Sequence, residues 1–197
     1  MNNVTTFKSL ENLVGEKTIN LRGQAHVIIV GVGGVGSWCA EYLVRSAIGK
    51  ITLIDLDDIC ISNTNRQLHT QSSTLGRSKV RTLKERMEDI NPHVQVIGIE
   101  DFLTANNIAQ YIDEGAIILD AIDSLSVKCE LIDYCLDKKI KLVTTGGAGG
   151  KTNPHKIAVA DLSATFNDPL LLRIRKKLRR SHDFPKKKKV HLGVPTI

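Results

Sequence analysis

The stretch Ala25-His-Val-Ile-Ile-Val-Gly-Val-Gly-Gly-Val-Gly-Ser37 joins a short apolar run to a glycine-rich turn of the form Gly-x-Gly-x-x-Gly. In such a turn Gly31 lets the chain reverse tightly, Gly33 lets the backbone approach a phosphate, and Gly36 lets the next helix pack close to the strand. A helix that begins near Gly34 would aim its free N–H groups and positive dipole end at that phosphate. The stretch therefore predicts a phosphate site on a strand-to-helix turn.

A carboxylate extends this interpretation to a nucleotide. Asp55 lies nineteen residues after Gly36 and directly follows a second apolar run, 51–54. An acidic residue at this distance, at the end of a second strand, suits a ribose hydroxyl. NAD and ATP both carry a ribose and phosphates, so these two features leave the choice between them open.

The polar residues that follow this carboxylate favour ATP. They include several amides and two cations: Asp57, Asn63, Asn65, Arg66, Gln67 and Lys79. A dehydrogenase needs no such basic set, whereas a triphosphate whose pyrophosphate leaves needs donors that neutralise the departing charge. The alternative is that Arg66 and Lys79 are ordinary surface charges.

Two more carboxylates lie in Asp120-Ala-Ile-Asp-Ser124, which follows a later apolar run. Ligands of α/β proteins bind at the carboxyl ends of the strands. We expect Asp123 either to hold a magnesium ion that bridges phosphates or to cap the helix that follows. The spacing leaves both open.

Apolar strands and amphipathic helices alternate along the chain. The periodicity predicts strands over 25–30, 51–55, 94–99, 116–120 and 140–145, and helices over 8–22, 35–47, 76–90, 105–113 and 124–138. Near-continuous apolar strands such as Val27-Ile-Ile-Val30 are typical of a parallel sheet that is covered on both faces. The expected fold class is α/β, a doubly wound, Rossmann-like, mostly parallel sheet with helices on both faces.

Length and composition fit one domain: 197 residues, of which 42% are hydrophobic and 24% are charged. No apolar run approaches the roughly 18 to 20 residues that span a bilayer, and the polar start does not resemble a signal peptide. We therefore expect a cytoplasmic protein. The four cysteines form no CxxC pair, so reduced structural thiols are expected rather than a zinc site or disulfides: Cys39, Cys60, Cys129 and Cys135.

The net charge of +6 is distributed unevenly. Residues 173–189 hold ten Lys/Arg and one acidic residue, which leaves 17 basic and 20 acidic residues elsewhere, a net charge of −3. A basic stretch on an acidic body suits a phosphate backbone better than a small anionic metabolite. A solvated tail is the alternative. The predicted boundary therefore separates a nucleotide-binding domain, 1–172, from a basic C-terminal segment, 173–197.

Several strings resemble the E1-like (ThiF/MoeB/HesA) superfamily of activating enzymes, over about residues 12–172. They are Gly31-Val-Gly-Gly-Val-Gly-Ser37, Asp55-Leu-Asp57, Ser62-Asn-Thr-Asn-Arg-Gln67, Lys79 three residues after Gly76, Ile90-Asn-Pro92 and Asp120-Ala-Ile-Asp123. Three others are similar to the tRNA threonylcarbamoyladenosine dehydratase (TcdA or CsdL) branch: Asn63-Thr-Asn-Arg-Gln67, Thr144-Thr-Gly-Gly-Ala-Gly-Gly150 and Asp161-Leu162 with Asp168-Pro-Leu170.

The resemblance implies a reaction. The enzyme would adenylate the carboxylate of the threonylcarbamoyl group on the tRNA adenosine beside the anticodon and release pyrophosphate. Attack from within the same modification would then close a ring, with net loss of water and without a nucleophilic cysteine.

The resemblance also implies roles for the site residues. The catalytic residues would be Arg66, Lys79 and Asp123, the last of which would hold Mg²⁺. Asp55 would bind the ribose, and Asn65, Arg66 and Lys79 would bind the phosphates. The full ATP-binding set is Gly31, Gly33, Gly34, Gly36, Asp55, Asp57, Asn63, Asn65, Arg66, Gln67, Lys79 and Asp123.

Several partners follow from the same resemblance. They are tRNA that carries threonylcarbamoyladenosine, a second copy of the chain in a homodimer, and a cysteine desulfurase or sulfur acceptor. Two alternatives to the dehydratase stay open. One is a ThiF/MoeB-type adenylyltransferase that activates a ubiquitin-like protein or serves a sulfur pathway, although the CxxC pairs of those branches are absent. The other is an inactive, truncated nucleotide-binding remnant.

Two departures from the family pattern bear on activity. The family's N-terminal arginine, which reaches the phosphates of the partner subunit, should fall near Thr6 or Asn12, and neither residue can replace it. The dehydratase branch also continues well beyond the string Leu192-Gly-Val194. Residues 173–197 are therefore expected to begin an incomplete substrate-side region, and the chain is expected to bind ATP but to turn over poorly.

Overall fold

The computed structural model describes residues 6–182, 184–185 and 190–197. The chain forms two compact units. The first comprises Met1–Phe102 and Gly115–Ile117, and the second comprises Leu103–Glu114 and Ile118–Ile197.

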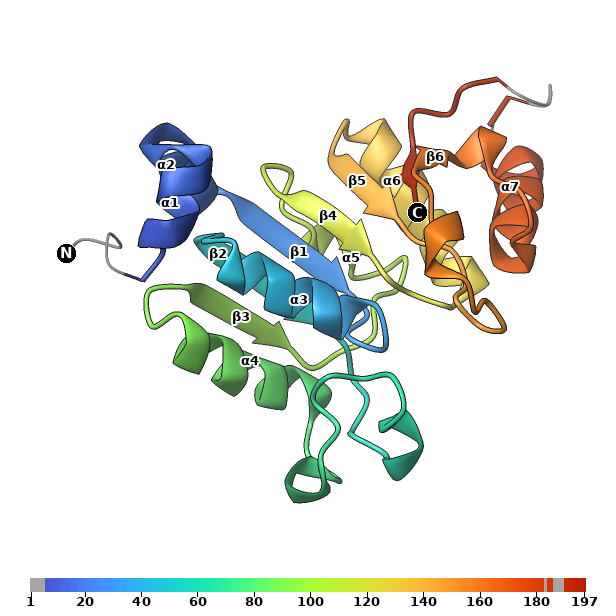
Figure 1. The fold of residues 1–197 in the computed structure, drawn as a ribbon. Coiled ribbons are helices and arrows are strands. Elements are labelled where there is room, and N and C mark those ends of the chain that lie inside the picture. Colours follow the sequence, from blue (N-terminus) through green and yellow to red (C-terminus); the bar gives the residue numbers. More distant parts are fainter. Residues whose placement is uncertain (1–5, 183, 186–189) are drawn as a thin grey trace. The chain divides into compact units, whose positions relative to one another are not determined.

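The first unit is built on three parallel strands (Figure 1). They are β1 (His26–Val30), β2 (Lys50–Ile54) and β3 (Gln95–Ile99), in the order β3-β2-β1. Val27 pairs with Ile51, and Ile51 pairs with Val96. Four of the five residues in β1 and in β2 are buried, which agrees with the continuous apolar runs in the sequence.

Two helices pack on these strands and on each other (Figure 1). Helix α3 (Gly36–Arg45) contacts β1, and helix α4 (Lys79–Ile90) contacts β2 and β3. The buried Glu41 of α3 joins the helices, because its Oε2 accepts a 2.8 Å hydrogen bond from Arg86 Nε of α4. Burial acts to raise the pKa of Glu41, but hydrogen bonds from Arg86 and Arg45 outweigh it and hold this pKa below its ordinary value.

The N-terminal helix differs from the prediction. The expected single helix 8–22 is wrong, because the chain forms α1 (Lys8–Val14) and α2 (Glu16–Gln24) with a break at Gly15. Gly15 has a φ of +84°, which ends a helix. Phe7 and Ile19 pack with Ala47, so the break lets both segments cover the same part of the unit.

Four described strands belong to the second unit, apart from Ile117 at the start of β4. They are β4 (Ile117–Asp120), β5 (Lys141–Thr144), β6 (Ala160–Asp161) and β7 (Pro195–Thr196), in the order β4-β5-β7-β6. Strands β5 and β7 are parallel, whereas β6 and β7 are antiparallel. The α/β class with mostly parallel strands is thus confirmed. None of the helices in the described parts of the chain is long and apolar enough to cross a bilayer.

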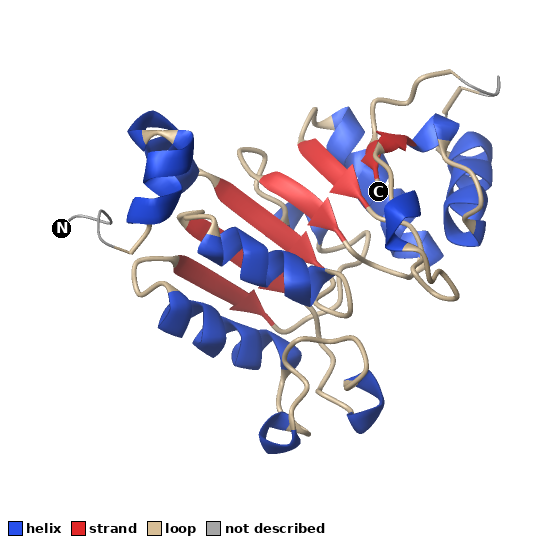
Figure 2. Ribbon diagram, viewed as in Figure 1, coloured by secondary structure: helices blue, strands red, loops and turns tan. Residues whose placement is uncertain are grey.

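The described residues of this unit form three helices, of which α6 (Leu125–Asp137) packs against α7 (Pro169–Ser181) (Figure 2). The third, α5 (Ile108–Tyr111), is shorter than the predicted 105–113, because Asn107 Oδ1 accepts from Thr104 N and shapes a turn before it. Short 3₁₀ turns complete the described elements: η1 (Ile61–Asn63) and η2 (Ser72–Thr74) in the first unit, η3 (Pro154–Lys156) and η4 (Leu162–Ala164) in the second.

No helix was predicted where α7 lies. Its buried residues Leu171, Ile174 and Leu178 are spaced i, i+3 and i+7, which is the spacing of one helix face. Asp168 caps it by accepting from Leu171 N at 2.9 Å. The helix crosses residue 172, and the domain boundary expected there stays a prediction. Within the basic segment, residues 183 and 186–189 lie outside the described residues.

A buried ion pair links β4 to α6. Lys128 Nζ lies 2.8 Å from Asp120 Oδ2, and both side chains are fully buried. Lys128 also donates to the carbonyl of Ile122 at 2.9 Å, and Asp120 accepts from Thr144 Oγ1 at 2.5 Å and from Ile122 N at 3.1 Å. Burying both charges is tolerable because each has a partner and further hydrogen bonds.

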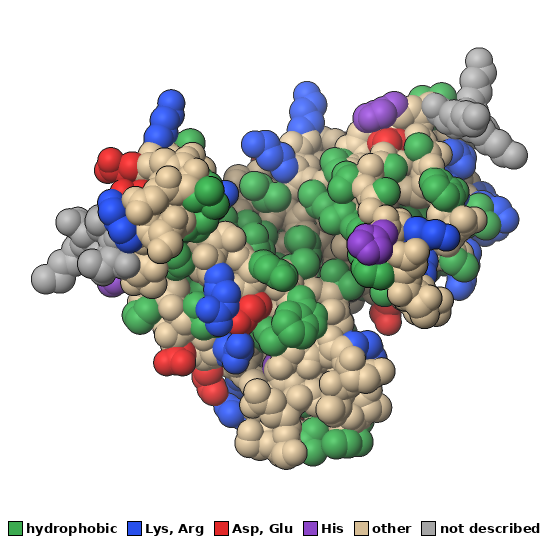
Figure 3. All heavy atoms as spheres, in the orientation of Figure 1, with side chains coloured by type: hydrophobic (Ala, Val, Ile, Leu, Met, Phe, Trp, Pro, Cys, Tyr) green, Lys and Arg blue, Asp and Glu red, His purple; other side chains and the backbone are tan. Residues whose placement is uncertain are grey.

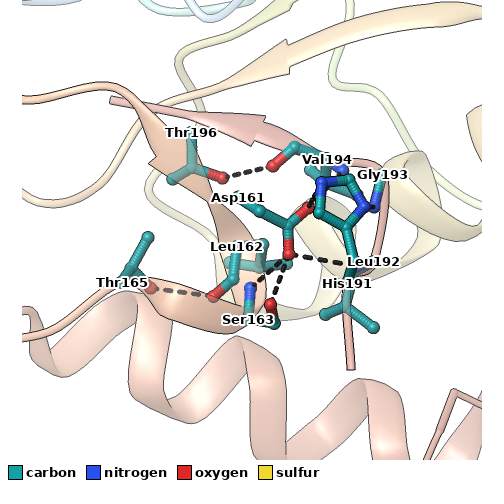
Figure 4. Close-up of polar contacts among 9 residues, drawn as sticks. All are labelled: Asp161, Leu162, Ser163, Thr165, His191, Leu192, Gly193, Val194 and Thr196. Atoms are coloured by element: carbon teal, nitrogen blue, oxygen red, sulfur yellow. Dashed lines mark hydrogen bonds and ion pairs between the residues drawn. The ribbon is translucent and has the colours of Figure 1, made fainter. Parts of the chain in front are cut away.

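Asp161 ties the last residues of the chain to β6 and η4 (Figure 4). Its carboxylate accepts from Leu192 N and Val194 N, each at 3.0 Å, and from Ser163 N at 2.9 Å. Burial acts to raise the pKa of Asp161, but these donors and the Ser163 hydroxyl lower it to about 2.

Replacing Lys128 with Met should lower the free energy of unfolding by about 3 to 5 kcal/mol, because the buried Asp120 loses its counter-charge. Urea unfolding measures this change. The control Lys138→Met removes an exposed ammonium 3.3 Å from Asp137, so less than about 1 kcal/mol should be lost. A loss below about 1 kcal/mol for Lys128→Met would contradict the assigned role.

The stabilising effect of Asp161 should depend on pH. The folded-state pKa of about 2 lies below the ordinary value of 3.8, so the contribution is full above the ordinary pKa and is lost as the pH falls toward the folded pKa. The stability advantage of the wild type over Asp161→Asn should therefore shrink between about pH 5 and pH 2. Unfolding in urea at a series of pH values checks this, and a constant advantage across that range would refute it.

Candidate nucleotide site

The glycine-rich turn joins β1 to α3 in the first unit. Gly31 has a φ of +86°, and its N–H donates to the carbonyl of Ile54 at 2.9 Å. A Cβ on Gly36 would lie 1.9 Å from the carbonyl oxygen of Gly31, so only glycine fits there. The helix starts at Gly36, two residues later than the predicted start near Gly34. This geometry is that of a phosphate-binding turn.

Asp55 lies beside this turn. Its Oδ2 accepts from Val32 N at 2.8 Å, and its Oδ1 accepts from Asp57 N at 3.0 Å. A carboxylate oxygen accepts more than one hydrogen bond, so Asp55 retains capacity for the ribose hydroxyl that the sequence predicts. The carboxylate therefore holds the turn and keeps the capacity to accept a further hydrogen bond.

Lys79 is the first residue of α4, directly after the N-cap residue Ser78. It is only 5% exposed, and its Nζ lies 2.7 Å from Asp57 Oδ2. The alternative interpretation of Lys79 as a surface charge is thus wrong. Asp57 is half exposed at its side chain, so an anionic ligand can approach the pair from solvent.

The segment 63–69 runs along the glycine turn. Arg66 Cγ lies 3.2 Å from the point that a Cβ on Gly34 would occupy, and Gln67 Nε2 lies 3.6 Å from the corresponding point on Gly33. Two side chains of α3 hold the segment, because Trp38 Nε1 donates to the carbonyl of Arg66 at 3.0 Å and Ser37 Oγ accepts from Leu68 N at 3.3 Å.

The other side chains of this segment have different surroundings. Asn63 is buried, and its Oδ1 accepts from Cys60 N at 3.0 Å, so it holds the turn η1. Arg66 is exposed and donates to the carbonyl of Ser62 at 3.0 Å and to Asn65 Oδ1 at 2.9 Å. Because Arg66 and Asn65 are exposed, a ligand could replace the hydrogen bonds that they make, whereas Asn63 holds the turn η1.

Asp123 belongs to the second unit, whereas the other predicted site residues belong to the first. It is exposed in the loop between β4 and α6. Ser124 occupies the N-cap position of α6, so the alternative interpretation of Asp123 as the helix cap is wrong. Asp120, the other carboxylate of the same string, is occupied by Lys128.

Sequence reasoning missed several polar residues that support the site. Ser37, Trp38, His69 and Thr74 contact the segment or its flanks, and three of the four are nearly buried. The partners of Ser37 and Trp38 lie 31 and 28 residues away, so no local pattern reveals these two contacts. Ser37 and His69 could have been suspected only from their positions next to Gly36 and Gln67.

The cysteines divide into two kinds. Burial raises the pKa of Cys129 to about 11 and that of Cys135 to about 12, which makes both thiols unreactive. Cys60 is exposed, and its side chain accepts from the backbone N–H of Asn63 in a capping box of η1, which agrees with the expected structural role. A hydrogen bond from the Ser62 hydroxyl, at 3.3 Å, lowers the pKa of Cys60.

The residues present fit a nucleoside triphosphate. A glycine turn offers backbone N–H groups, Asp55 offers an acceptor for a ribose, and Lys79 and Arg66 offer positive charge on the same unit. The exposed carboxylate of Asp123 is the kind of oxygen ligand that Mg²⁺ prefers. The groups on the first unit can bind phosphates and neutralise a departing pyrophosphate.

Known proteins share this chain's sequence and fold. Residues 8–189 match the model of the ThiF family. The tRNA threonylcarbamoyladenosine dehydratase of Escherichia coli (strain K12) is 46% identical over 192 residues, which cover 97% of this chain and 72% of that protein. The Haemophilus influenzae protein of the same name is 48% identical over 175 residues, which cover 88% of this chain and 67% of that protein.

The crystal structure of the E. coli protein, TcdA, in complex with ATP matches the fold. The TM-score is 0.95 at 46% identity, over 98% of this chain and 80% of that chain. The family model spans most of this chain, and both relatives are aligned over at least two thirds of their own length. The chain therefore belongs to the ThiF family.

Proposed function

We propose that this chain is an ATP-dependent tRNA threonylcarbamoyladenosine dehydratase. The observation that carries the proposal is the site itself, in a chain closely similar to dehydratases of that name: the glycine turn, Asp55, the Asp57–Lys79 pair and Arg66 lie on one unit. The proposal includes a cytoplasmic location, which agrees with a tRNA substrate.

The chemistry begins with a poor electrophile. The threonylcarbamoyl carboxylate becomes reactive only when one of its oxygens leaves as AMP. A carboxylate oxygen attacks the α-phosphorus of ATP, a new P–O bond forms, and the bond to pyrophosphate breaks. A nucleophile within the same modification then attacks the activated carbonyl carbon, AMP leaves with the electron pair of the C–O bond, and the ring closes with net loss of water.

The protein's share of this chemistry is positioning and charge neutralisation. Asp57 holds the Lys79 ammonium at the start of α4. From there the ammonium can stabilise the negative charge of the leaving pyrophosphate. Arg66 adds a second positive charge from the exposed side of the turn. Asp123 would hold Mg²⁺, which offsets phosphate charge when bound.

Basic side chains on α7 support a tRNA contact. Arg173, Lys176 and Arg180 are exposed and spaced i, i+3 and i+7, so they share one face of the helix. Figure 3 shows Lys and Arg side chains gathered over the region where α7 lies in Figure 1. Two other cations of α7 form hydrogen bonds within the protein. Lys177 Nζ donates to Ser126 Oγ at 2.7 Å, and Arg179 Nε donates to the carbonyl of Pro185 at 3.2 Å.

The remaining partners are proposals of the same kind. A homodimer agrees with three large apolar side chains that are exposed in the second unit: Ile157 by 69%, Val159 by 73% and Phe166 by 79%. A cysteine desulfurase or sulfur acceptor is proposed from the family resemblance.

ATP–pyrophosphate exchange tests the function. We expect exchange with tRNA that carries threonylcarbamoyladenosine, and none with unmodified tRNA or with a carrier protein that ends in Gly-Gly. Exchange should fall about 100-fold to 1,000-fold in Lys79→Met, because a preorganised charge on the leaving group is lost, and should be abolished in Asp123→Ala.

The matched control is Lys84→Met, which removes an exposed cation of the same helix 3.8 Å from Glu88 and should leave exchange unchanged. Exchange with the carrier protein would instead indicate a ThiF/MoeB-type adenylyltransferase. Absence of exchange with every acceptor would indicate an inactive, truncated nucleotide-binding remnant.

The affinity for tRNA should fall steeply with salt, and the three exposed cations of α7 should carry part of that dependence. Replacing Arg173, Lys176 and Arg180 with Gln should reduce the slope of log affinity against log salt by roughly 2 to 3, because each phosphate contact contributes roughly 0.7 to 0.9. Fluorescence anisotropy at several salt concentrations measures the slope. An affinity that does not change with salt would refute the contact.

A further inference from the structure

His69 is a buried residue of the segment that runs along the glycine turn. It is only 2% exposed, and its backbone carbonyl accepts from Thr74 Oγ1 at 2.7 Å. The neighbouring Leu68 N–H donates to the fully buried Ser37 Oγ at 3.3 Å. The imidazole therefore occupies a fixed position relative to the glycine turn.

The hydrogen bond of His69 determines its tautomer. Nε2 lies 3.1 Å from Gln67 Oε1, and a carbonyl oxygen can only accept, so Nε2 carries the proton. Nδ1 has no hydrogen-bond partner among the described residues. Burial, together with the nearby charge of Lys79, lowers the pKa of His69 to about 4, so the ring is neutral at pH 7.

The same bond is compatible with only one orientation of the Gln67 amide when His69 Nε2 carries the proton. Because Gln67 Oε1 is hydrogen-bonded to His69, the amide nitrogen of Gln67, Nε2, points the other way. This nitrogen lies 3.6 Å from the point that a Cβ on Gly33 would occupy. Gln67 thus presents N–H donors to the turn. With the amide reversed, its oxygen would face the anionic phosphate and repel it.

Resting on the function proposed above, we propose that His69 is a positioning residue, which fixes the Gln67 amide so that its NH₂ group faces the phosphates held at Gly33. His69 does not touch the nucleotide. It acts through Gln67, and its effect is confined to ligands that carry phosphates.

Affinities for ATP and for adenosine separate this role from a structural one, because adenosine lacks the phosphates. In isothermal titration of the full chain, His69→Leu should weaken ATP binding about tenfold, as expected when a hydrogen bond to a charged group is misdirected. Adenosine binding should change less than about twofold. His69→Gln keeps an N–H donor and should restore most of the ATP affinity.

Two further variants sharpen the test. Gln67→Met should weaken ATP binding as much as His69→Leu, and the double variant should be no weaker than Gln67→Met alone, because both changes remove the same interaction. The matched control is Thr70→Val, which removes the hydroxyl of the other buried, unpartnered side chain among the described residues. It should leave the ratio of the two affinities unchanged.

Nitrogen NMR of the labelled wild type tests the tautomer without a mutation. The His69 signals should report a neutral ring protonated at Nε2 at pH 7. A ring protonated at Nδ1, or a titration midpoint above about pH 6, would overturn the proposal.

Other outcomes are equally decisive. The positioning role of His69 would be overturned by equal losses of ATP and adenosine affinity in His69→Leu, by additive losses in the double variant, or by an unchanged ATP affinity in His69→Leu. None of these results would affect the proposed function. A wild-type chain that binds ATP no more tightly than adenosine would overturn the phosphate site and with it the proposed function.

Discussion

The site in the first unit depends on the close approach of helix α3 to the carbonyl oxygen of Gly31, which leaves no room for a side chain at Gly36. Since α3 starts there, its first turn brings Ser37 and Trp38 to the segment that carries Arg66. That segment then lies along the turn that its side chains are proposed to serve. One steric constraint thus positions groups that are about thirty residues apart in the sequence.

The carboxylates of the second unit have two different roles, one structural and one proposed toward a ligand. Asp120, Asp161 and Asp168 of the second unit have donors from their own chain: Lys128 for the first, Leu192 and Val194 for the second, and Leu171, Gly147 and Lys151 for the third. They hold loops and helix ends in place. Asp123 differs from them because it is exposed, and this difference supports its proposed role toward a ligand.

The sequence predicted the α/β class and most strands, because strands buried on both faces are written as continuous apolar runs. It also placed Lys79 on a helix beside the turn. The break at Gly15 was missed because the apolar pattern continues across it, and α7 was missed because its three buried residues are interleaved with cations. His69 and Lys128 could not be predicted, since a partner that is near in the sequence, Gln67 for the first and Asp120 for the second, does not reveal that the side chain is buried.

The fully buried pair of Asp120 and Lys128 has a consequence for divergence within the family. Losing one partner costs about 3 to 5 kcal/mol, a large fraction of the 5 to 15 kcal/mol that typically separates a folded domain from its unfolded chain. Replacing both by apolar residues of similar volume is often neutral. Evolution can therefore replace the buried ion pair by an apolar pair only if both residues change at nearly the same time. The two positions are expected to covary among relatives.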